Sequence, residues 1–298
     1  MATTKVALIT GGASGMGLAV AKALSARPDW IIHILDINEE RGAQTAQDLP
    51  RTFFHRADVT KYSELGEAFQ QSFKAQGRLD FVFANAGVIE RTNFYAEHPV
   101  ANEQDVTPPP ELDLLSIDAD LKGVVLTTYL AQHYFRHSPH KGVGATLVMT
   151  ASCGGLYPSF YSPLYSAAKF GVVGFMRSIA QHFIADGVRV NAICPGIVRT
   201  NLVDQNGWAS FPQDRFTEMS SVVRVVLQLV DGGEPSGQGL SDTPGSHLPA
   251  SKLYGLAVEI SDSGVYFRDQ HEFCDEGMRE VMAATVLENQ VGAILNAD

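Results

Sequence analysis

The sequence predicts an α/β protein built on a parallel sheet that helices cover on both faces. Short runs of β-branched and other apolar residues alternate along the first half with segments of helical composition. Strands that alternate with helical segments of this length belong to a parallel sheet with helical crossovers. The runs expected as strands are 5–10, 30–35, 52–59, 79–84, 189–194 and, as the last strand, 253–259.

Composition excludes several classes of protein. The chain has 298 residues, 45% of them hydrophobic and 18% charged, which suits a globular protein with a sizeable core. No run approaches the ~20 apolar residues of a membrane span, and residues 1–5 lack the layout of a secretory signal. The net charge of -11 argues against a nucleic-acid surface. Three cysteines without a CxxC pair indicate a reducing, cytoplasmic location.

A glycine-rich turn follows the first expected strand. Gly11, Gly15 and Gly17 separate the strand 5–10 from an alanine-rich helix at 18–24. Glycine permits tight backbone geometry, and the free N–H groups at a helix start attract phosphate. The Gly-x-x-x-Gly-x-Gly spacing differs from the general dinucleotide fingerprint. A glycine turn alone is weak evidence, because many loops need glycine.

Asp36 ends the second expected strand, about 20 residues after the glycines. A carboxylate there can accept hydrogen bonds from the ribose hydroxyls of NAD and would repel a 2′-phosphate. Arg41 is the only base nearby, so NAD is favoured over NADP. Asp36 alone could equally be a helix N-cap.

Ser152, Tyr165 and Lys169 indicate proton chemistry. Tyr165 and Lys169 are four residues apart, so on a helix their side chains share one face. An ammonium beside a phenol favours the phenolate and lowers the phenol pKa. The Ser152 hydroxyl could hold a carbonyl or alcohol oxygen beside that phenol. An ordinary helix surface pair would have the same spacing, so the pattern needs structural context.

Five pieces in order give the chain a strong resemblance to the short-chain dehydrogenase/reductase family, over roughly residues 4–200. They are 10–17, Asp58-Val59, 85–87, Ser152 with Tyr165-x-x-x-Lys169, and Pro195-Gly196 with Thr200. The resemblance, closest to the 15-hydroxyprostaglandin dehydrogenase-like branch, implies a three-layer, doubly wound Rossmann-type domain. It implies Tyr165 as general acid/base, Ser152 as the group that orients the substrate oxygen, and Lys169 as the ribose ligand. It also implies a homodimer or homotetramer, and these cofactor-binding residues: Gly11, Ser14, Gly15, Met16, Gly17, Asp36, Asp58, Val59, Asn85, Ala86, Gly87, Tyr165, Lys169, Pro195, Gly196, Ile197, Val198 and Thr200.

Two segments depart from the family pattern. Asp120 stands where the family commonly has an asparagine that supports a proton-relaying water chain. An ionised carboxylate can accept from water but cannot donate, so we expect modified proton handling rather than lost activity. The segment 90–113, with three consecutive prolines at 108–110, is longer than the family's usual connection. It is either an excursion near the active-site rim or a plain solvent loop.

The expected substrate region is rich in aromatic residues. The family places its lid after Thr200, here about 201–220, and the loop after Ser152 adds further apolar side chains. We therefore expect a bulky, largely apolar alcohol or ketone, although core aromatics would look the same. The domain is expected to span 1–265, with an extension 266–298 that carries a helical stretch 277–289 and packs on its own or a neighbouring subunit. Candidate substrate residues are Cys153, Tyr157, Phe160, Leu202, Trp208 and Phe211.

Two other groups favour structural roles. Cys153 is adjacent to Ser152, and a small buried hydrophobe is favoured over a reactive thiol. His133 and His137 are one turn apart, but the sequence places no third ligand and catalytic zinc needs three. No metal is expected.

The leading hypothesis is an NAD-dependent oxidoreductase that interconverts a secondary alcohol and its ketone. One alternative is a family member whose redox step serves an isomerisation or rearrangement of a complex natural product. Another is an NAD-binding sensor without turnover, against which the intact Ser152, Tyr165 and Lys169 argue.

Overall fold

The structure is a computed structural model that describes residues 4–99, 106–203, 205–232, 253–286 and 289. The chain forms two compact units, Met1–Phe267 and Arg268–Asp298. Within the described residues, no helix is both long and apolar enough to cross a bilayer.

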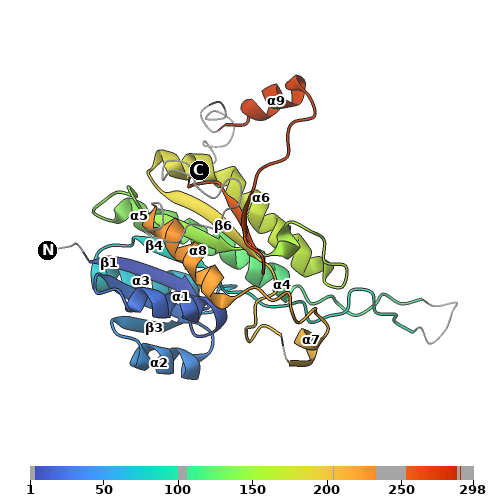
Figure 1. Cartoon of the computed structure of the whole chain (residues 1–298), viewed down its shortest axis with the longest axis horizontal. Coiled ribbons are helices and arrows are strands. Elements are labelled where there is room, and N and C mark those ends of the chain that lie inside the picture. The colour runs from blue at the N-terminus through green and yellow to red at the C-terminus, as the bar shows by residue number, and fades with distance from the viewer. Residues whose placement is uncertain (1–3, 100–105, 204, 233–252, 287–288, 290–298) are drawn as a thin grey trace. The chain divides into compact units, whose positions relative to one another are not determined.

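The first unit is organised around one sheet (Figure 1). Its order is β3-β2-β1-β4-β5-β6-β7-β8 among the described residues. From β1 to β7 every neighbouring pair is parallel, as the sequence predicts. The strands are β1 (Lys5–Thr10), β2 (Trp30–Asp36), β3 (Thr52–Arg56), β4 (Phe81–Ala84), β5 (Thr146–Thr150), β6 (Arg189–Pro195), β7 (Ala257–Ile260) and β8 (Val265–Arg268).

Three strand predictions need correction. The run 79–84 is a strand only from Phe81, in β4. β3 ends at Arg56 rather than at Val59, because Asp58 turns the chain: its Oδ1 accepts hydrogen bonds from the backbone N–H and the hydroxyl of Thr60, at 3.0 and 2.8 Å. The run 253–259 is not the last strand, since β8 follows β7 and lies beside it. Their short connection makes this pair antiparallel, because parallel neighbours need a crossover of about a dozen residues.

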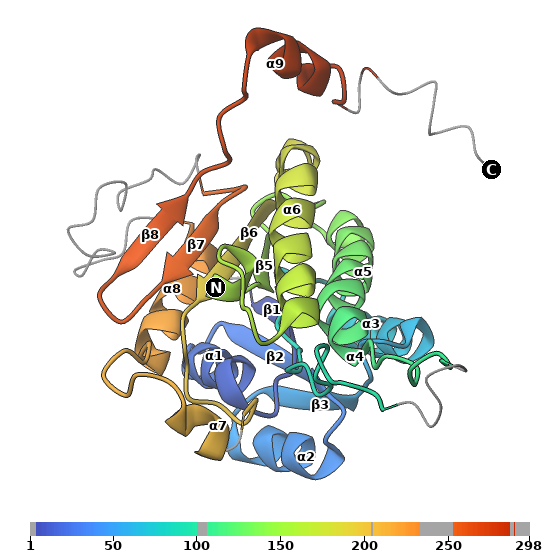
Figure 2. The same cartoon turned by 90° about the vertical axis from the view of Figure 1, so that its right-hand side faces the viewer.

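Helices cover both faces of the sheet (Figure 2). On one face, α1 (Gly15–Ser25) and α8 (Met219–Asp231) bury apolar side chains against the strands. On the other face, the same is done by α3 (Tyr62–Gln76), α5 (Gly123–His137) and α6 (Pro163–Ala185). A further helix, α2 (Glu39–Asp48), packs beside β3. This is the three-layer, doubly wound arrangement that the sequence predicts.

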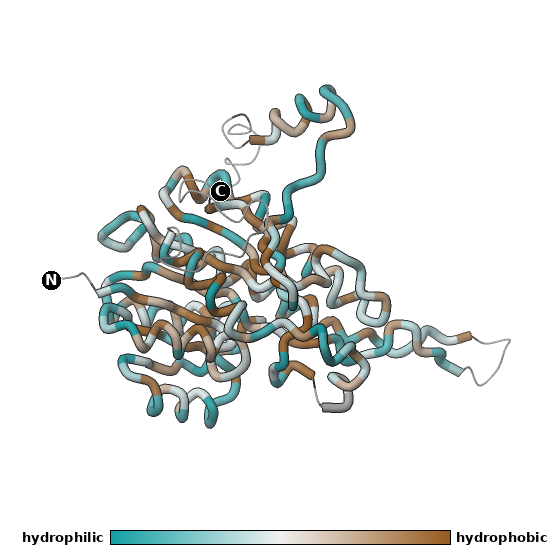
Figure 3. The backbone as a smooth tube through the Cα atoms, viewed as in Figure 1, coloured by the Kyte–Doolittle hydropathy of each residue, from teal (hydrophilic) through white to brown (hydrophobic). Residues whose placement is uncertain are grey.

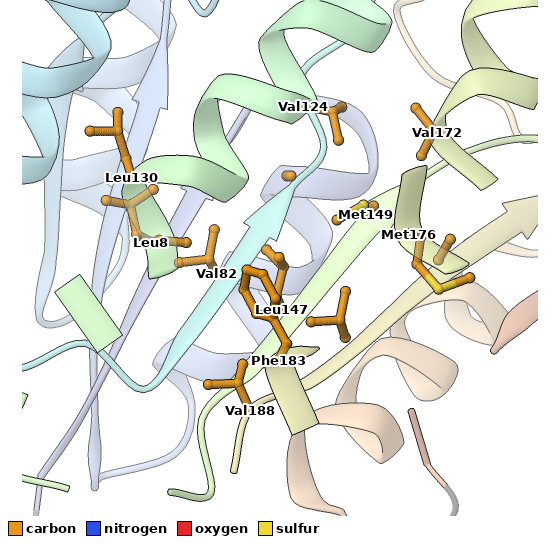
Figure 4. Packing of buried hydrophobic residues seen from close by; sticks show 14 of the residues in the cluster. Leu8, Val82, Val124, Leu130, Leu147, Met149, Val172, Met176, Phe183 and Val188 are labelled. Carbon is orange, nitrogen blue, oxygen red and sulfur yellow. The ribbon is translucent and has the colours of Figure 1, made fainter. Parts of the chain in front are cut away.

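The core under α5 and α6 fixes the two helices that carry the site. Figure 4 shows Leu8, Val82 and Leu147 of the sheet among side chains that include Val172 and Met176 of α6. All five are at most 1% exposed, and burial of each such side chain contributes about 1.5–3 kcal/mol. Figure 3 colours the backbone by hydropathy and shows hydrophobic residues along the interior of the first unit. A displacement of α6 would break many of these contacts at once.

Short elements complete the first unit. They are α4 (Leu115–Ile117), a π-helical turn η1 (Asp118–Lys122), a 3₁₀ turn η2 (Cys153–Gly155) and α7 (Gln205–Ala209). In the second unit, α9 (Glu276–Ala283) is shorter than the helical stretch expected at 277–289. The carboxylate of Asp275 caps it by accepting a hydrogen bond from Met278 N at 2.7 Å.

Candidate active site

A cavity of about 720 Å³ opens where the carboxyl ends of the parallel strands meet. The strand order reverses between β1 and β4, and open α/β sheets bind ligands at such a switch point. The cavity collects nearly all residues that the sequence singles out: Gly11, Ser14, Gly15, Met16, Asp36, Asp58, Val59, Asn85, Ala86, Gly87, Asp120, Ser152, Cys153, Tyr165, Lys169, Pro195, Gly196, Ile197, Val198, Thr200, Leu202, Trp208 and Phe211.

Three expected site residues lie outside the cavity lining. Gly17 serves packing, because a Cβ atom there would stand 2.2 Å from the carbonyl oxygen of Gly11. Tyr157 is 50% exposed and donates its hydroxyl hydrogen bond to Glu259 Oε2 at 3.2 Å. Phe160 is 84% exposed. The expectation that these two aromatics line the substrate wall therefore needs correction: the loop after Ser152 turns them away.

The glycine turn is shaped for close approach of a ligand. Gly11 and Gly15 have positive φ angles of +66° and +52°, which side chains rarely adopt. A Cβ at Gly11 would also stand 2.9 Å from Ala86 Cα. The side chain of Ser14, the N-cap of α1, makes no capping hydrogen bond. The first N–H groups of α1 are thus left for an anionic ligand, as at other helix starts.

Asp36 is fixed by the backbone on either side of it. Its Oδ2 accepts from Ala13 N at 3.1 Å and its Oδ1 accepts from Asn38 N at 3.0 Å. The N-cap of α2 is Asn38, whose side chain accepts from Arg41 N at 2.9 Å, so the alternative that Asp36 caps this helix is wrong. Arg41 also lines the cavity. A carboxylate and a guanidinium therefore both reach the same end of it.

Asn85 braces the strand ends at the middle of the cavity. Its Nδ2 donates to Thr10 O at 3.1 Å, and its Oδ1 accepts from the Thr150 hydroxyl at 3.1 Å. The Thr10 hydroxyl oxygen in turn accepts from the N–H groups of Asn85 and Ala86, at 2.9 and 3.1 Å. These bonds join the ends of β1, β4 and β5, so the chain after β4 has a fixed course along the cavity.

Ser152, Tyr165 and Lys169 meet at the inner end of the cavity. Ser152 follows β5, and its Oγ accepts a hydrogen bond from Gly154 N at 3.1 Å. A Cβ at Gly154 would stand 3.4 Å from Tyr165 Cε1 and 3.5 Å from Ser152 Oγ, which places hydroxyl and ring against the same point. Lys169 Nζ lies 5.5 Å from the centre of the Tyr165 ring and donates to Thr150 O at 2.9 Å. The predicted helical pair and its serine are therefore together.

Asp120 forms a direct ion pair with Lys169. Its Oδ2 lies 3.2 Å from Lys169 Nζ, and both side chains are at most 3% exposed. Its Oδ1 accepts from Val88 N at 2.7 Å. Asp120 lies in the π-helical turn η1, a type of irregularity that is frequent at functional sites. A side chain at Gly87 would crowd it, because a Cβ there would stand 3.1 Å from Asp120 Oδ1.

Burial and charge act in opposite directions on these groups. Burial raises the pKa of Tyr165, while Lys169 and Ser152 lower it and Asp120 raises it, and the net direction is upward. Lys169 does favour the phenolate, as predicted, but the expected lowering of the phenol pKa is outweighed by desolvation. Burial alone would lower the pKa of Lys169, but the Asp120 carboxylate reverses this and raises it. Burial raises the pKa of Asp120, and Lys169 opposes that rise. Lys169 is thus held as an ammonium.

The outer wall of the cavity is aromatic. Trp208 and Phe211 have ring centres 6.2 Å apart, and the ring centres of Phe211 and Tyr161 are 6.3 Å apart. Trp208 Nε1 also donates to Thr200 O at 3.4 Å, which ties the wall to the chain after β6. Tyr161 takes the place expected for Tyr157 and Phe160. Sequence alone offers no signal that separates these three aromatics within one loop.

Two residues that sequence reasoning missed adjoin the site. Glu90 Oε2 accepts hydrogen bonds from Leu164 N and Tyr165 N, at 2.8 and 3.0 Å. Arg91, next to it, lines the cavity. The long segment that follows contributes no other lining residue before Leu115, among its described part. No local pattern reveals Glu90, because its partners lie 74 and 75 residues further along the chain.

Cys153 and the histidine pair show no further chemistry. Burial raises the pKa of the Cys153 thiol, which disfavours the reactive thiolate. On α5, the rings of His133 and His137 are tilted by 34° with centres 4.3 Å apart, and His137 Nδ1 lies 2.8 Å from His133 O. Over the part of the chain that the structure describes, no three metal-ligating side chains come together.

Comparison with known proteins bears on the family of the chain. The family model for the short chain dehydrogenase matches residues 5–208. The short-chain dehydrogenase/reductase prx7 of Penicillium rubens is 76% identical over 281 residues, which are 94% of this chain and 100% of that protein. The human (Homo sapiens) 15-hydroxyprostaglandin dehydrogenase (NAD+) is 34% identical over 208 residues, which are 67% of this chain and 70% of that protein.

A solved structure supports the fold. It is that of the 3-ketoacyl-(acyl-carrier-protein) reductase from Brucella melitensis complexed with NADH. The TM-score is 0.68 at 22% identity, and the alignment covers 88% of this chain and 98% of that one.

Proposed function

The chain belongs to the short-chain dehydrogenase/reductase family, and we propose that it is an NAD-dependent oxidoreductase that interconverts a bulky, largely apolar secondary alcohol and its ketone. The observation that carries this proposal is the placement of the Tyr165 phenol beside the Ser152 hydroxyl, in a cavity whose other end has a glycine-lined helix start. A proton donor and acceptor therefore faces the space beside a dinucleotide cradle.

The cavity fits a nicotinamide dinucleotide. The positive φ angles at Gly11 and Gly15 leave room for a pyrophosphate at the start of α1. Asp36 would accept hydrogen bonds from the adenosine ribose, and Lys169 would contact the nicotinamide ribose. When bound, the nicotinamide ring supplies the acceptor or donor for the hydride. A carboxylate at Asp36 disfavours a 2′-phosphate, whereas Arg41 at the same end would attract one, and we place the carboxylate first because backbone bonds fix it from both sides.

The protein's part in oxidation is to orient the alcohol and take its proton. Ser152 Oγ holds the substrate oxygen by a hydrogen bond, and Tyr165 Oη accepts the hydroxyl proton while the carbon–hydrogen bond beside it is broken. In reduction Tyr165 returns the proton to the carbonyl oxygen. Lys169 stabilises the phenolate form by its charge. General acid–base catalysis of this kind contributes about 10²–10⁴-fold.

Asp120 favours the charged form of Lys169 and at the same time raises the pKa of the Tyr165 phenol. Its direct ion pair and burial replace the water-relay role that an asparagine has in the family pattern. Asp120 Oδ1 accepts from Val88 N, whereas Oδ2 lies 3.2 Å from Lys169 Nζ and accepts no hydrogen bond from any residue that the structure describes. The carboxylate therefore acts mainly through its charge on Lys169.

The substrate class and the assembly follow from the wall and from the family. An aromatic rim of Tyr161, Trp208 and Phe211 suits an apolar molecule of some bulk. We further propose a homodimer or homotetramer in the cytoplasm. We assign the dehydrogenase domain to 1–265 and propose that 266–298 packs on its own or a neighbouring subunit.

A panel of bulky secondary alcohols and ketones, followed by the absorbance of NADH and NADPH, tests the proposal. We expect NAD-linked turnover that Tyr165→Phe removes. Preference for NADP would contradict the assignment of Asp36. A changed substrate skeleton without net NADH would indicate the redox-linked isomerase instead. Activity unchanged in Tyr165→Phe would indicate a cofactor-binding sensor.

A further inference from the structure

The first turn of α6 is capped by a residue from far away in the sequence. Ser162 is the N-cap, but its side chain makes no capping hydrogen bond and instead pairs with the Ser159 hydroxyl at 2.7 Å. Pro163 has no N–H group. The next two N–H groups, of Leu164 and Tyr165, both donate to Glu90 Oε2, at 2.8 and 3.0 Å. Glu90 therefore supplies the acceptor for both free donors before the helix closes its own bonds.

The same segment also holds the other end of the catalytic pair. Val88 N donates to Asp120 Oδ1 at 2.7 Å, and Asp120 pairs with Lys169. Residues 85–89 line the cavity where the cofactor would lie. The segment after β4 thus reaches both catalytic side chains. Glu90 bonds the backbone of Tyr165, and Val88 bonds Asp120, which pairs with the ammonium of Lys169.

Glu90 carries a second feature that a plain helix cap does not need. Its Oε1 is buried and accepts no hydrogen bond from any residue that the structure describes. A buried carboxylate oxygen without a partner is unfavourable. An exposed Ser or Asp at the N-cap would satisfy the same N–H groups at lower cost. Glu90 thus links the start of α6 to the chain that follows the cavity-lining segment 85–89.

We propose that Glu90 is a positioning residue. Through its two hydrogen bonds to the start of α6, it couples the binding of cofactor along residues 85–89 to the placement of Tyr165. The inference rests on the proposed function for its kinetic consequence, because only a working Tyr165 can report it in turnover. Its structural consequence can be measured without any substrate.

The substrate-free test is hydrogen exchange of the Leu164 and Tyr165 amides, resolved by NMR, with and without NADH. In the parent protein we expect NADH to slow exchange of the Leu164 and Tyr165 amides. In Glu90→Ala we expect both amides to exchange about tenfold faster or more, since hydrogen bonds to a charged acceptor are strong. We also expect NADH to lose most of its effect on them. Unchanged exchange in Glu90→Ala, or full NADH protection in that variant, would overturn the proposal.

The kinetic test compares Glu90→Ala and Glu90→Gln with the parent on whichever alcohol the parent turns over. We expect kcat to fall about ten- to a hundredfold in Glu90→Ala, with the Kd for NADH changed less than threefold (~0.6 kcal/mol). Glu90→Gln keeps an oxygen acceptor and should restore most of kcat. Equal impairment of the two variants, or a kcat in Glu90→Ala within twofold of the parent, would overturn the proposal.

Asp275→Ala provides the matched control, because Asp275 is also a carboxylate that accepts from a helix N-terminal N–H, at α9. It should leave kcat and the exchange of Leu164 and Tyr165 unchanged, and a lower kcat or faster exchange would mean that loss of any cap has this effect. If the parent turns over no alcohol, the proposed function fails, while the exchange experiment still decides the role of Glu90.

Discussion

The floor and the rim of the cavity differ in the contacts that hold their side chains. The floor consists of Asp120, Thr150, Ser152, Tyr165 and Lys169, on or beside β5, η1 and α6, where charges are paired and backbone groups are bonded. The rim consists of Tyr161, Leu202, Trp208 and Phe211, on loops and the short α7, where the side chains meet mainly through ring contacts. Proton transfer requires fixed distances, so rigid elements supply it, whereas substrate fit is left to side chains that can move.

The two regions also differ in exposure. Asp120 and Lys169 are almost completely buried, while Tyr161 is 61% and Leu202 36% exposed. Substitutions in the floor should therefore change the rate of the chemical step, and substitutions in the rim should change the affinity for substrate. This difference can be tested one residue at a time.

The largest effect is expected at the floor. Tyr165→Phe removes only the phenolic oxygen and should lower kcat by about 10²–10⁴-fold, the usual contribution of a general acid or base. Binding of NADH, measured by fluorescence titration, should stay close to that of the parent. Tyr62→Phe, at an exposed tyrosine of α3, is the matched control and should turn over normally. If Tyr165→Phe kept the kcat of the parent, Tyr165 would not be the general acid or base.

A smaller effect is expected at the rim. Phe211→Ala deletes a ring that contacts both Tyr161 and Trp208 and should raise KM for an apolar alcohol by roughly 10- to 200-fold, as loss of apolar contact does in other pockets. kcat should change little, because no proton-transferring group is disturbed. Steady-state kinetics on a homologous series of alcohols measures both constants. Phe94→Ala, at an exposed ring outside the cavity, serves as control. A fall in kcat with unchanged KM would mean that Phe211, like the floor residues, affects the chemical step and not substrate affinity.

A smaller effect again is expected at the adenosine end of the cavity. Asp36→Asn keeps an oxygen that can accept from Ala13 N but removes the charge that disfavours a 2′-phosphate. The ratio of kcat/KM for NADP to that for NAD should rise about tenfold, since charged hydrogen bonds contribute ~1.5–3 kcal/mol. Arg41→Gln should lower the same ratio. An NADP preference in the parent, or a ratio that Asp36→Asn leaves unchanged, would show that Arg41 and not Asp36 sets the choice.

Sequence predicts contacts between residues that are near in the chain better than contacts between distant segments, for physical reasons. Tyr165 and Lys169 are neighbours on one helix, and Gly11 and Gly15 directly follow a strand, so local spacing fixes their geometry. Glu90 reaches α6 across 74 residues, and only the folded chain brings the two together. Likewise Tyr157, Phe160 and Tyr161 lie in one loop, and its path decides that Tyr161 alone faces the cavity.

Two other differences have the same origin. β8 was not predicted because its pairing with β7 depends on a turn at Ser261–Gly264, closed by a bond from Ser261 N to Gly264 O at 2.8 Å. The predicted direction of the Tyr165 pKa shift is wrong, because spacing shows that Lys169 is near but not how deeply the phenol is buried. Electrostatic attraction can be anticipated from sequence, whereas desolvation depends on the packing around the group.

The smallest and most specific effect is expected from Asp120→Asn. Asp120 raises the pKa of Tyr165 and also raises that of Lys169. In oxidation Tyr165 must be deprotonated, so kcat/KM rises with pH through the phenol pKa. The neutral amide removes the charge that raises this pKa and can still accept from Val88 N, so the rising limb should move to lower pH and activity below the optimum should increase.

The pH dependence of kcat/KM for Asp120→Asn, set beside that of Asp118→Asn, decides the role of this carboxylate. Asp118 is an exposed neighbour in the same π-helical turn, where it pairs with Lys122 at 2.9 Å, so its substitution perturbs η1 without touching the floor. Its pH profile should match that of the parent. A rising limb that moves to higher pH in Asp120→Asn would mean that Lys169 loses its proton without the carboxylate. In that case the ion pair supports catalysis chiefly by keeping the ammonium charged, and its repulsion of the phenolate is the lesser effect.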